Sequence, residues 1–145
     1  MRLASSLGCI AAALMTTGVV SSDAAGPRVK ADVSCRPAAE KLQYDCAIKL
    51  TDARTSETVT GAELTVGADM PSMPMAHNVR PAKATATTEP GTYHARIQLE
   101  MHGDWVLRLD LAGHIRDRVV KSLRFEDDLV IDARKPGRPS PPHKH

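Results

Sequence analysis

Two runs of alternating apolar and polar residues, joined by a short turn, decide the fold in the stretch YHARIQLEMHGDWVLRLDL, residues 93–111. Apolar side chains occupy every second position from Tyr93 to Met101, and again from Trp105 to Leu111. Because successive side chains of a β-strand point to opposite faces, this spacing predicts two half-buried strands. Gly103 and the aspartate after it supply the turn between them.

The same period-two pattern recurs elsewhere in the chain, and no stretch has the period of a helix. It predicts a weaker strand over residues 77–89 and clearer strands at four other places: 29–35, 44–50, 62–68 and 119–125, the last with a candidate extension at 129–131. About seven short strands in roughly 100 residues predict an all-β, immunoglobulin-like antiparallel β-sandwich. A small closed barrel is the alternative, because periodicity alone does not separate the two.

Residues 1–24 have the three-part layout of a secretory signal peptide. Arg2 precedes an apolar stretch over residues 7–20, and small residues follow up to Ala24. We therefore expect cleavage near Ala24, a mature protein in the periplasm and no membrane span after cleavage. A lipoprotein signal ending at Cys9 is the competing interpretation, but only one positive charge precedes that cysteine.

The rest of the chain divides into one domain and a tail. Residues 25–132 are enough for a single core and are close to neutral, whereas residues 133–145 are basic and rich in proline, so we expect this tail to be disordered. The body has no basic stripe, and the whole chain has only one Trp, two Tyr and one Phe to stack on bases. Nucleic acid is therefore not an expected partner.

Cys35 and Cys46 remain after signal removal, and an even pair in an exported chain predicts a disulfide. If these two residues face each other across antiparallel strands, Val33 opposes Ile48 and the other apolar positions also match. A metal-binding or reactive thiol pair is the alternative, but closer spacing is typical of such pairs.

The distinctive chemistry lies in the stretch MPSMPMAH, residues 70–77. Thioethers are soft, uncharged ligands suited to Cu(I), and imidazole also binds copper. Two prolines favour an extended loop that turns several sulfur atoms towards one point. The sequence predicts a Cu(I) site formed by Met73, Met75 and His77, with Met70, Met101 or His102 in support.

Strand direction supports this grouping. If the strands run up and down, the loop at residues 70–77 and the turn at residues 101–104 lie at the same end of the domain. His94 and His114 are then expected towards the opposite end.

A structural role for the methionines remains open. Met70 and Met101 continue the inward phase of their strands, so each can be core instead of ligand, and the Met-Pro loop can act as an apolar plug or contact surface. Enzymatic motifs are missing from the sequence: it has no phosphate-binding glycine loop, nucleophile elbow or HExxH motif. We therefore expect a binding protein, not an enzyme.

Three spaced motifs resemble the YtkA-like and FixH-like envelope domains: the Met-Pro-x-Met segment, the Gly-x-Tyr start at Gly91 and the Gly-x-Trp start at Gly103. The resemblance spans roughly residues 45–125. It implies an immunoglobulin-like domain outside the cytoplasm, with copper-handling, metal-efflux or oxidase-assembly proteins as partners. The chain departs from the FixH type because it has no retained membrane anchor beyond the predicted signal, so a freestanding periplasmic carrier fits better.

Overall fold

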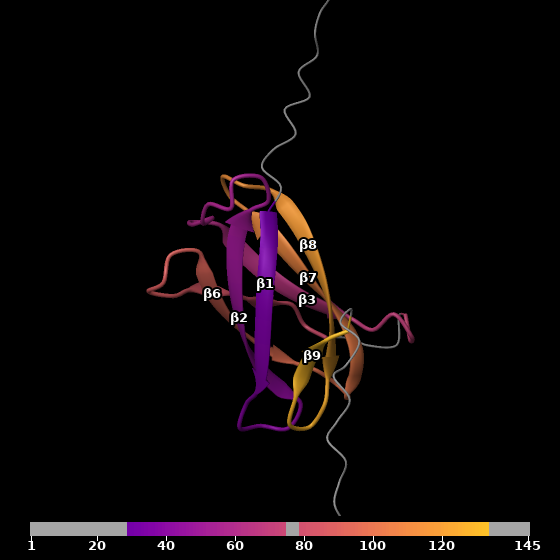
Figure 1. Ribbon diagram of the computed structural model, residues 1–145. Helices are drawn as coiled ribbons and strands as arrows, with labels where there is room; N and C mark the ends of the chain where they lie inside the picture. The colour runs from indigo at the N-terminus through magenta and orange to yellow at the C-terminus, as the bar shows by residue number, and fades with distance from the viewer. Residues whose placement is uncertain (1–28, 75–78, 134–145) are drawn as a thin grey trace, which may run out of the picture.

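The computed structural model describes residues 29–74 and 79–133, and these residues form two antiparallel β-sheets (Figure 1). The strands are β1 (Val29–Pro37), β2 (Gln43–Asp52), β3 (Glu63–Asp69), β4 (Ala82–Lys83), β5 (Thr85–Ala86), β6 (Thr92–Gln98), β7 (Gly103–Ala112), β8 (Asp117–Phe125) and β9 (Val130–Asp132). β4 and β5 have two residues each and β9 has three, which explains why the pattern predicted about seven strands instead of nine.

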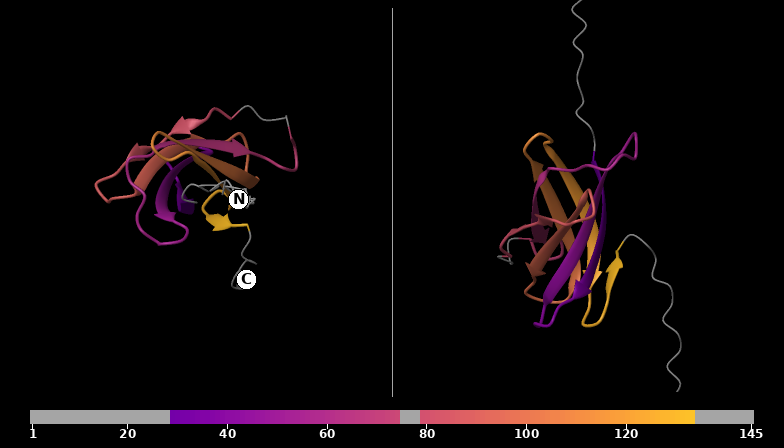
Figure 2. Two further views of the ribbon diagram at one scale, coloured as in Figure 1. Left: turned by 90° about the horizontal axis from the view of Figure 1, so that it is seen from above. Right: turned by 90° about the vertical axis from the view of Figure 1, so that its left-hand side faces the viewer.

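One sheet has the order β1-β2-β6-β5 and the other has the order β4-β3-β7-β8-β9. These are the A-B-E-D and C′-C-F-G orders of an immunoglobulin-like sandwich, with β9 added at one edge. Figure 1 shows β1 and β2 in front of the second sheet, and Figure 2 shows the molecule from above and from the side. The predicted fold class is confirmed.

Alternating residues of both sheets build the core. The core includes Tyr44 and Ile48 of β2 from one sheet and Trp105 and Leu107 of β7 from the other, all at most 2% exposed. The predicted inward phase of residues 93–101 and 105–111 is confirmed, except at Met101, which is 39% exposed. The reason is that β6 ends at Gln98 and Leu99 is the last buried residue before the chain turns.

The weak segment before β6 changes sheets, so the strand expected over residues 77–89 is divided. β4 pairs with β3, whereas β5 pairs with β6. Ala84 lies between the two short strands, and its N–H donates to the carbonyl of Leu64. The strands alternate in direction, as an up-and-down run predicts. Their neighbours differ from that run, because β7 pairs with β3 and β8 instead of with β6.

The disulfide joins β1 and β2. Cys35 is bonded to Cys46, which lies directly opposite it in the antiparallel register. Val33 opposes Ile48 and Ala31 opposes Leu50, as the sequence predicted. Unlike the inter-sheet disulfide of antibody domains, this one ties two neighbouring strands of the same sheet.

The predicted signal peptide (residues 1–24) and all but the first residue of the predicted tail (residues 133–145) lie outside the described residues. Within the described ranges no helix is long and apolar enough to cross a membrane.

Candidate functional site

The loop that follows β3 and the turn between β6 and β7 meet at one end of the sandwich. They line a common pocket of about 440 Å³, formed by Met70, Pro71, Ser72, Met73, Met101, His102, Gly103 and Asp104. The sequence predicted that these two segments share an end of the domain, and the pocket confirms it. Among the described residues, it gathers four of the six predicted ligands: Met70, Met73, Met101 and His102.

Met70 forms the floor of this pocket. It is 5% exposed and belongs to the core, so the structural role that the sequence left open for it is the one observed. Its methyl carbon lies 3.3 Å from the position that a β-carbon on Gly103 would occupy. Gly103 has a φ of +136°, so a glycine there allows both the backbone turn and the close approach of Met70.

Met73 and Met101 are the exposed thioethers of the pocket, at 38% and 39%. The N–H of Met73 donates to the carbonyl of Met70 at 3.1 Å, which holds the start of the Met-Pro loop in a tight turn. On the facing turn, the carbonyl of Met101 accepts a 3.1 Å hydrogen bond from the indole of Trp105. Each exposed methionine is thus positioned by a backbone contact to a buried residue.

His102 lies at the rim, beside the β8–β9 turn. Its Nε2 is 3.3 Å from Oδ1 of Asp127, and its side chain is 33% exposed. The sequence pattern did not identify Asp127 as a neighbour of the pocket. The register of β7 with β8, which places Gly103 opposite Phe125, brings the β8–β9 turn beside His102. The same turn is anchored by Tyr44, whose hydroxyl donates to the carbonyl of Glu126. Burial and the nearby charge of Asp127 raise the pKa of Tyr44.

Two ion pairs flank the pocket on the outer face of the second sheet. Arg124 donates two hydrogen bonds of 2.7 Å to the carboxylate of Asp104, and these hold the pKa of that carboxyl below its ordinary value. Asp69, at the end of β3, pairs with Arg108. Both carboxylates are therefore already engaged by arginine and are poorly placed to act as metal ligands.

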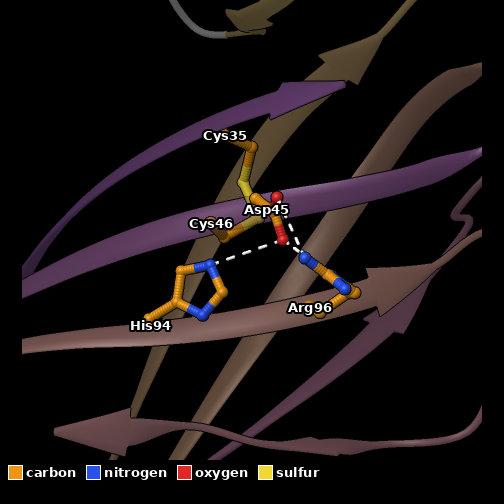
Figure 3. The surroundings of a disulfide bond; sticks show 5 residues. All are labelled: Cys35, Asp45, Cys46, His94 and Arg96. Atoms are coloured by element: carbon orange, nitrogen blue, oxygen red, sulfur yellow. Dashed lines mark hydrogen bonds and ion pairs between the residues drawn. A yellow bond between two sulfur atoms is a disulfide. The ribbon is translucent and has the colours of Figure 1, made fainter. Parts of the chain in front are cut away.

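The remaining histidines of the described residues lie elsewhere. His94 is on the outer face of the first sheet, where its Nε2 lies 3.4 Å from Oδ1 of Asp45, a carboxylate that also accepts a hydrogen bond from Arg96 (Figure 3). This hydrogen bond and the nearby positive charges lower the pKa of Asp45. His114 lies in the β7–β8 turn at the opposite end of the sandwich. Neither lines the methionine pocket, as the sequence predicted.

Met75 and His77, the other two predicted ligands, lie outside the described residues. Their part in the site stays a prediction from the sequence. Within the described ranges, no group of three or more His, Cys, Asp or Glu side chains is arranged to hold a metal ion. Among the described residues, the candidate metal ligands are therefore the methionine thioethers and the His102 imidazole that line the pocket.

The family model described as YtkA-like matches residues 28–110. The chain belongs to the YtkA-like family. In this YtkA-like domain the match runs from β1 into β7 and includes both methionine segments, but it ends before Asp127 and the β8–β9 turn. Searches of curated proteins and of solved structures gave no significant match. The likeness to FixH-like domains stays an expectation from the sequence.

Proposed function

We propose that this YtkA-like domain binds Cu(I) at the methionine pocket and delivers it to other copper-handling proteins of the periplasm, such as oxidase-assembly or efflux components. The observation that carries the proposal is the exposure of two thioethers, Met73 and Met101, on facing turns of one pocket. Methionine side chains are usually buried, so two exposed ones lining the same pocket are better explained by binding than by packing.

The donor set suits Cu(I) better than harder ions. Thioethers carry no charge and have no proton to lose, so they select soft Cu(I) over Zn(II), Mg(II) or Ca(II). His102 supplies an imidazole at the rim, and its Nε2 lies 3.3 Å from Oδ1 of Asp127, a placement like that of the carboxylates that commonly orient ligating histidines. Bound copper would supply a soft, exchangeable ion to a partner. Binding and delivery, without catalysis, are the activity that we propose.

The open setting of the pocket supports delivery instead of permanent storage. Met73 and Met101 are exposed, so a partner protein can reach these residues without unfolding the domain. Met70, in contrast, is almost inaccessible and supports the pocket from below.

Titration of the purified full chain with Cu(I), against a strong Cu(I) chelator, tests this proposal. We expect Cu(I) to bind with a clear preference over Zn(II), and His102→Gln to weaken the binding several-fold. His114→Gln is the matched control, because this exposed histidine lies at the opposite end, and it should leave binding unchanged. Equal affinity for Zn(II), or equal effects of the two substitutions, would argue against the site.

A second function follows from the same exposure. Met73 and Met101 also suit a contact surface for a protein partner without any metal, since methionine-rich surfaces adapt to varied partners. This alternative predicts that replacing both by leucine preserves activity in the cell, because apolarity and approximate volume are kept.

A further inference from the structure

The two ends of the sandwich carry different charge. At the methionine end, the described loop residues comprise five acidic side chains against two basic ones: Glu40, Glu100, Glu126, Asp127 and Asp128 against Lys41 and Arg80. The loops of the opposite end comprise two of each sign: Glu57 and Glu89 against Arg54 and Arg116. The methionine end is therefore the acidic end.

The acidic loops adjoin the methionine pocket. A second depression, of about 350 Å³, is lined by Lys41, Leu42, Glu100, Met101, His102 and Asp127, so it shares Met101 and His102 with the first. Exposed apolar surface continues on the β8–β9 turn, where Leu129 is 53% exposed. This end thus offers an apolar surface with an acidic margin, which is suited to a basic segment that contains apolar or proline residues.

The chain itself contains such a segment. Residues 134–145 hold four basic side chains and four prolines and no acidic residue. We propose that this basic segment docks on the acidic methionine end of its own domain. The proposal does not depend on metal binding by the pocket.

The distances permit this docking. The last described residue, Ala133, follows β9, which pairs with β8 so that Asp132 lies opposite Leu123 and Val130 opposite Phe125. The chain therefore leaves the sheet only about two residues, or ~7 Å, from the level of the acidic turn. Twelve residues reach at most ~40 Å when extended, so only part of the segment is needed for the return.

Tethering makes even a weak attraction sufficient. Exposed ion pairs contribute about 0–1 kcal/mol each, which is too little for a free peptide of this length to bind tightly. A segment linked to its site experiences an effective concentration in the millimolar range, so millimolar affinity fills the site for a large part of the time. Because the attraction is between exposed charges, salt should weaken it.

Zero-length carbodiimide crosslinking of the full chain, mapped by mass spectrometry, tests the proposal. Lys144 is the reporter, because it is far along the chain from the sheet. At low salt we expect Lys144 to link to Glu126, Asp127 or Asp128 several-fold more often than to Glu57 or Glu89. These links should fade at about 0.5 M salt.

Two variants sharpen the test. Glu126→Gln with Asp128→Asn should reduce the remaining link from Lys144 to Asp127, whereas the matched control Glu57→Gln with Glu89→Gln should not. Links spread evenly over both ends, or no links from Lys144 within the chain, would overturn the proposal. So would links found only between two chains, because the docked segment would then belong to a second copy.

Discussion

The indole N–H of Trp105 donates to the backbone carbonyl of Met101 at 3.1 Å. This bond connects a residue with an exposed side chain to one of the most buried side chains of the core. Trp105 is 1% exposed, whereas Met101 is 39% exposed. The turn that carries Met101 is thus held to the core by Trp105 and also lines the candidate site.

Trp105→Phe should therefore affect both stability and the site. It removes the hydrogen bond and part of the buried volume, and we expect the free energy of unfolding to fall by roughly 2–3 kcal/mol. Urea unfolding measures the loss. Tyr44→Phe is the comparison, because it removes only the bond to the Glu126 carbonyl and should cost about 1 kcal/mol. Equal effects of the two substitutions would mean that the Met101 turn is not anchored as described.

The disulfide should account for much of the stability of the first sheet. Cys35 and Cys46 close a short loop with a sequence separation of 11, for which the chain-entropy estimate is about 3 kcal/mol. We expect the double substitution of both cysteines by alanine to lower the free energy of unfolding by about that amount. A reductant should destabilise the native protein but not the double variant. A native protein whose stability does not respond to reductant would contradict this prediction.

Gly103→Ala should disturb the pocket floor in a way that Gly113→Ala does not. Both glycines have positive φ, at +136° and +96°, so each substitution should cost about 1–3 kcal/mol from backbone strain. Only at Gly103 does the new β-carbon meet Met70, at 3.3 Å, whereas nothing lies within 4 Å at Gly113. The methyl NMR signal of Met70 should therefore shift in the first variant and stay in place in the second. A shift in both variants would indicate a global effect.

The Asp104–Arg124 pair should make stability depend on pH in the acid range. Hydrogen bonds from Arg124 lower the folded-state pKa of Asp104, which returns to its ordinary value of 3.8 on unfolding. The stabilisation is therefore present above about pH 4 and is lost as pH falls through the lower, folded-state pKa. Melting temperatures measured from pH 5 to pH 2 should fall less steeply for Asp104→Asn than for the native protein. An unchanged slope would mean that the pair is not formed in solution.

Strand positions and the disulfide were predictable because each rests on local alternation. The opposition of Val33 to Ile48 and of Cys35 to Cys46 follows from matching apolar faces of two adjacent strands, and the structure shows this register. Strand direction also predicted that the Met-Pro loop and the 101–104 turn lie at the same end of the domain. This prediction is correct even though the order of neighbouring strands differs from a simple up-and-down run.

Other features needed information that a local pattern does not hold. The change of sheets around Ala84 depends on which edge each two-residue strand reaches, and such short strands leave almost no periodic trace. The contact of His102 with Asp127 depends on the register of β7 with β8, which places Gly103 opposite Phe125, and alternation alone does not fix that register. Met101 continues the alternation of inward positions in the sequence, but its side chain is exposed. The reason is that β6 ends at Gln98 and Leu99 is the last buried residue before the turn.

The central claim is that the sulfur atoms of Met73 and Met101 bind Cu(I), and competitive Cu(I) titration of Met73→Leu with Met101→Leu tests it most directly. Leucine keeps the apolar volume and removes only the thioethers, so the fold should be retained, and urea unfolding checks this. We predict a loss of affinity of at least about tenfold, equivalent to about 1.4 kcal/mol. Unchanged Cu(I) affinity in a folded double variant would contradict the account.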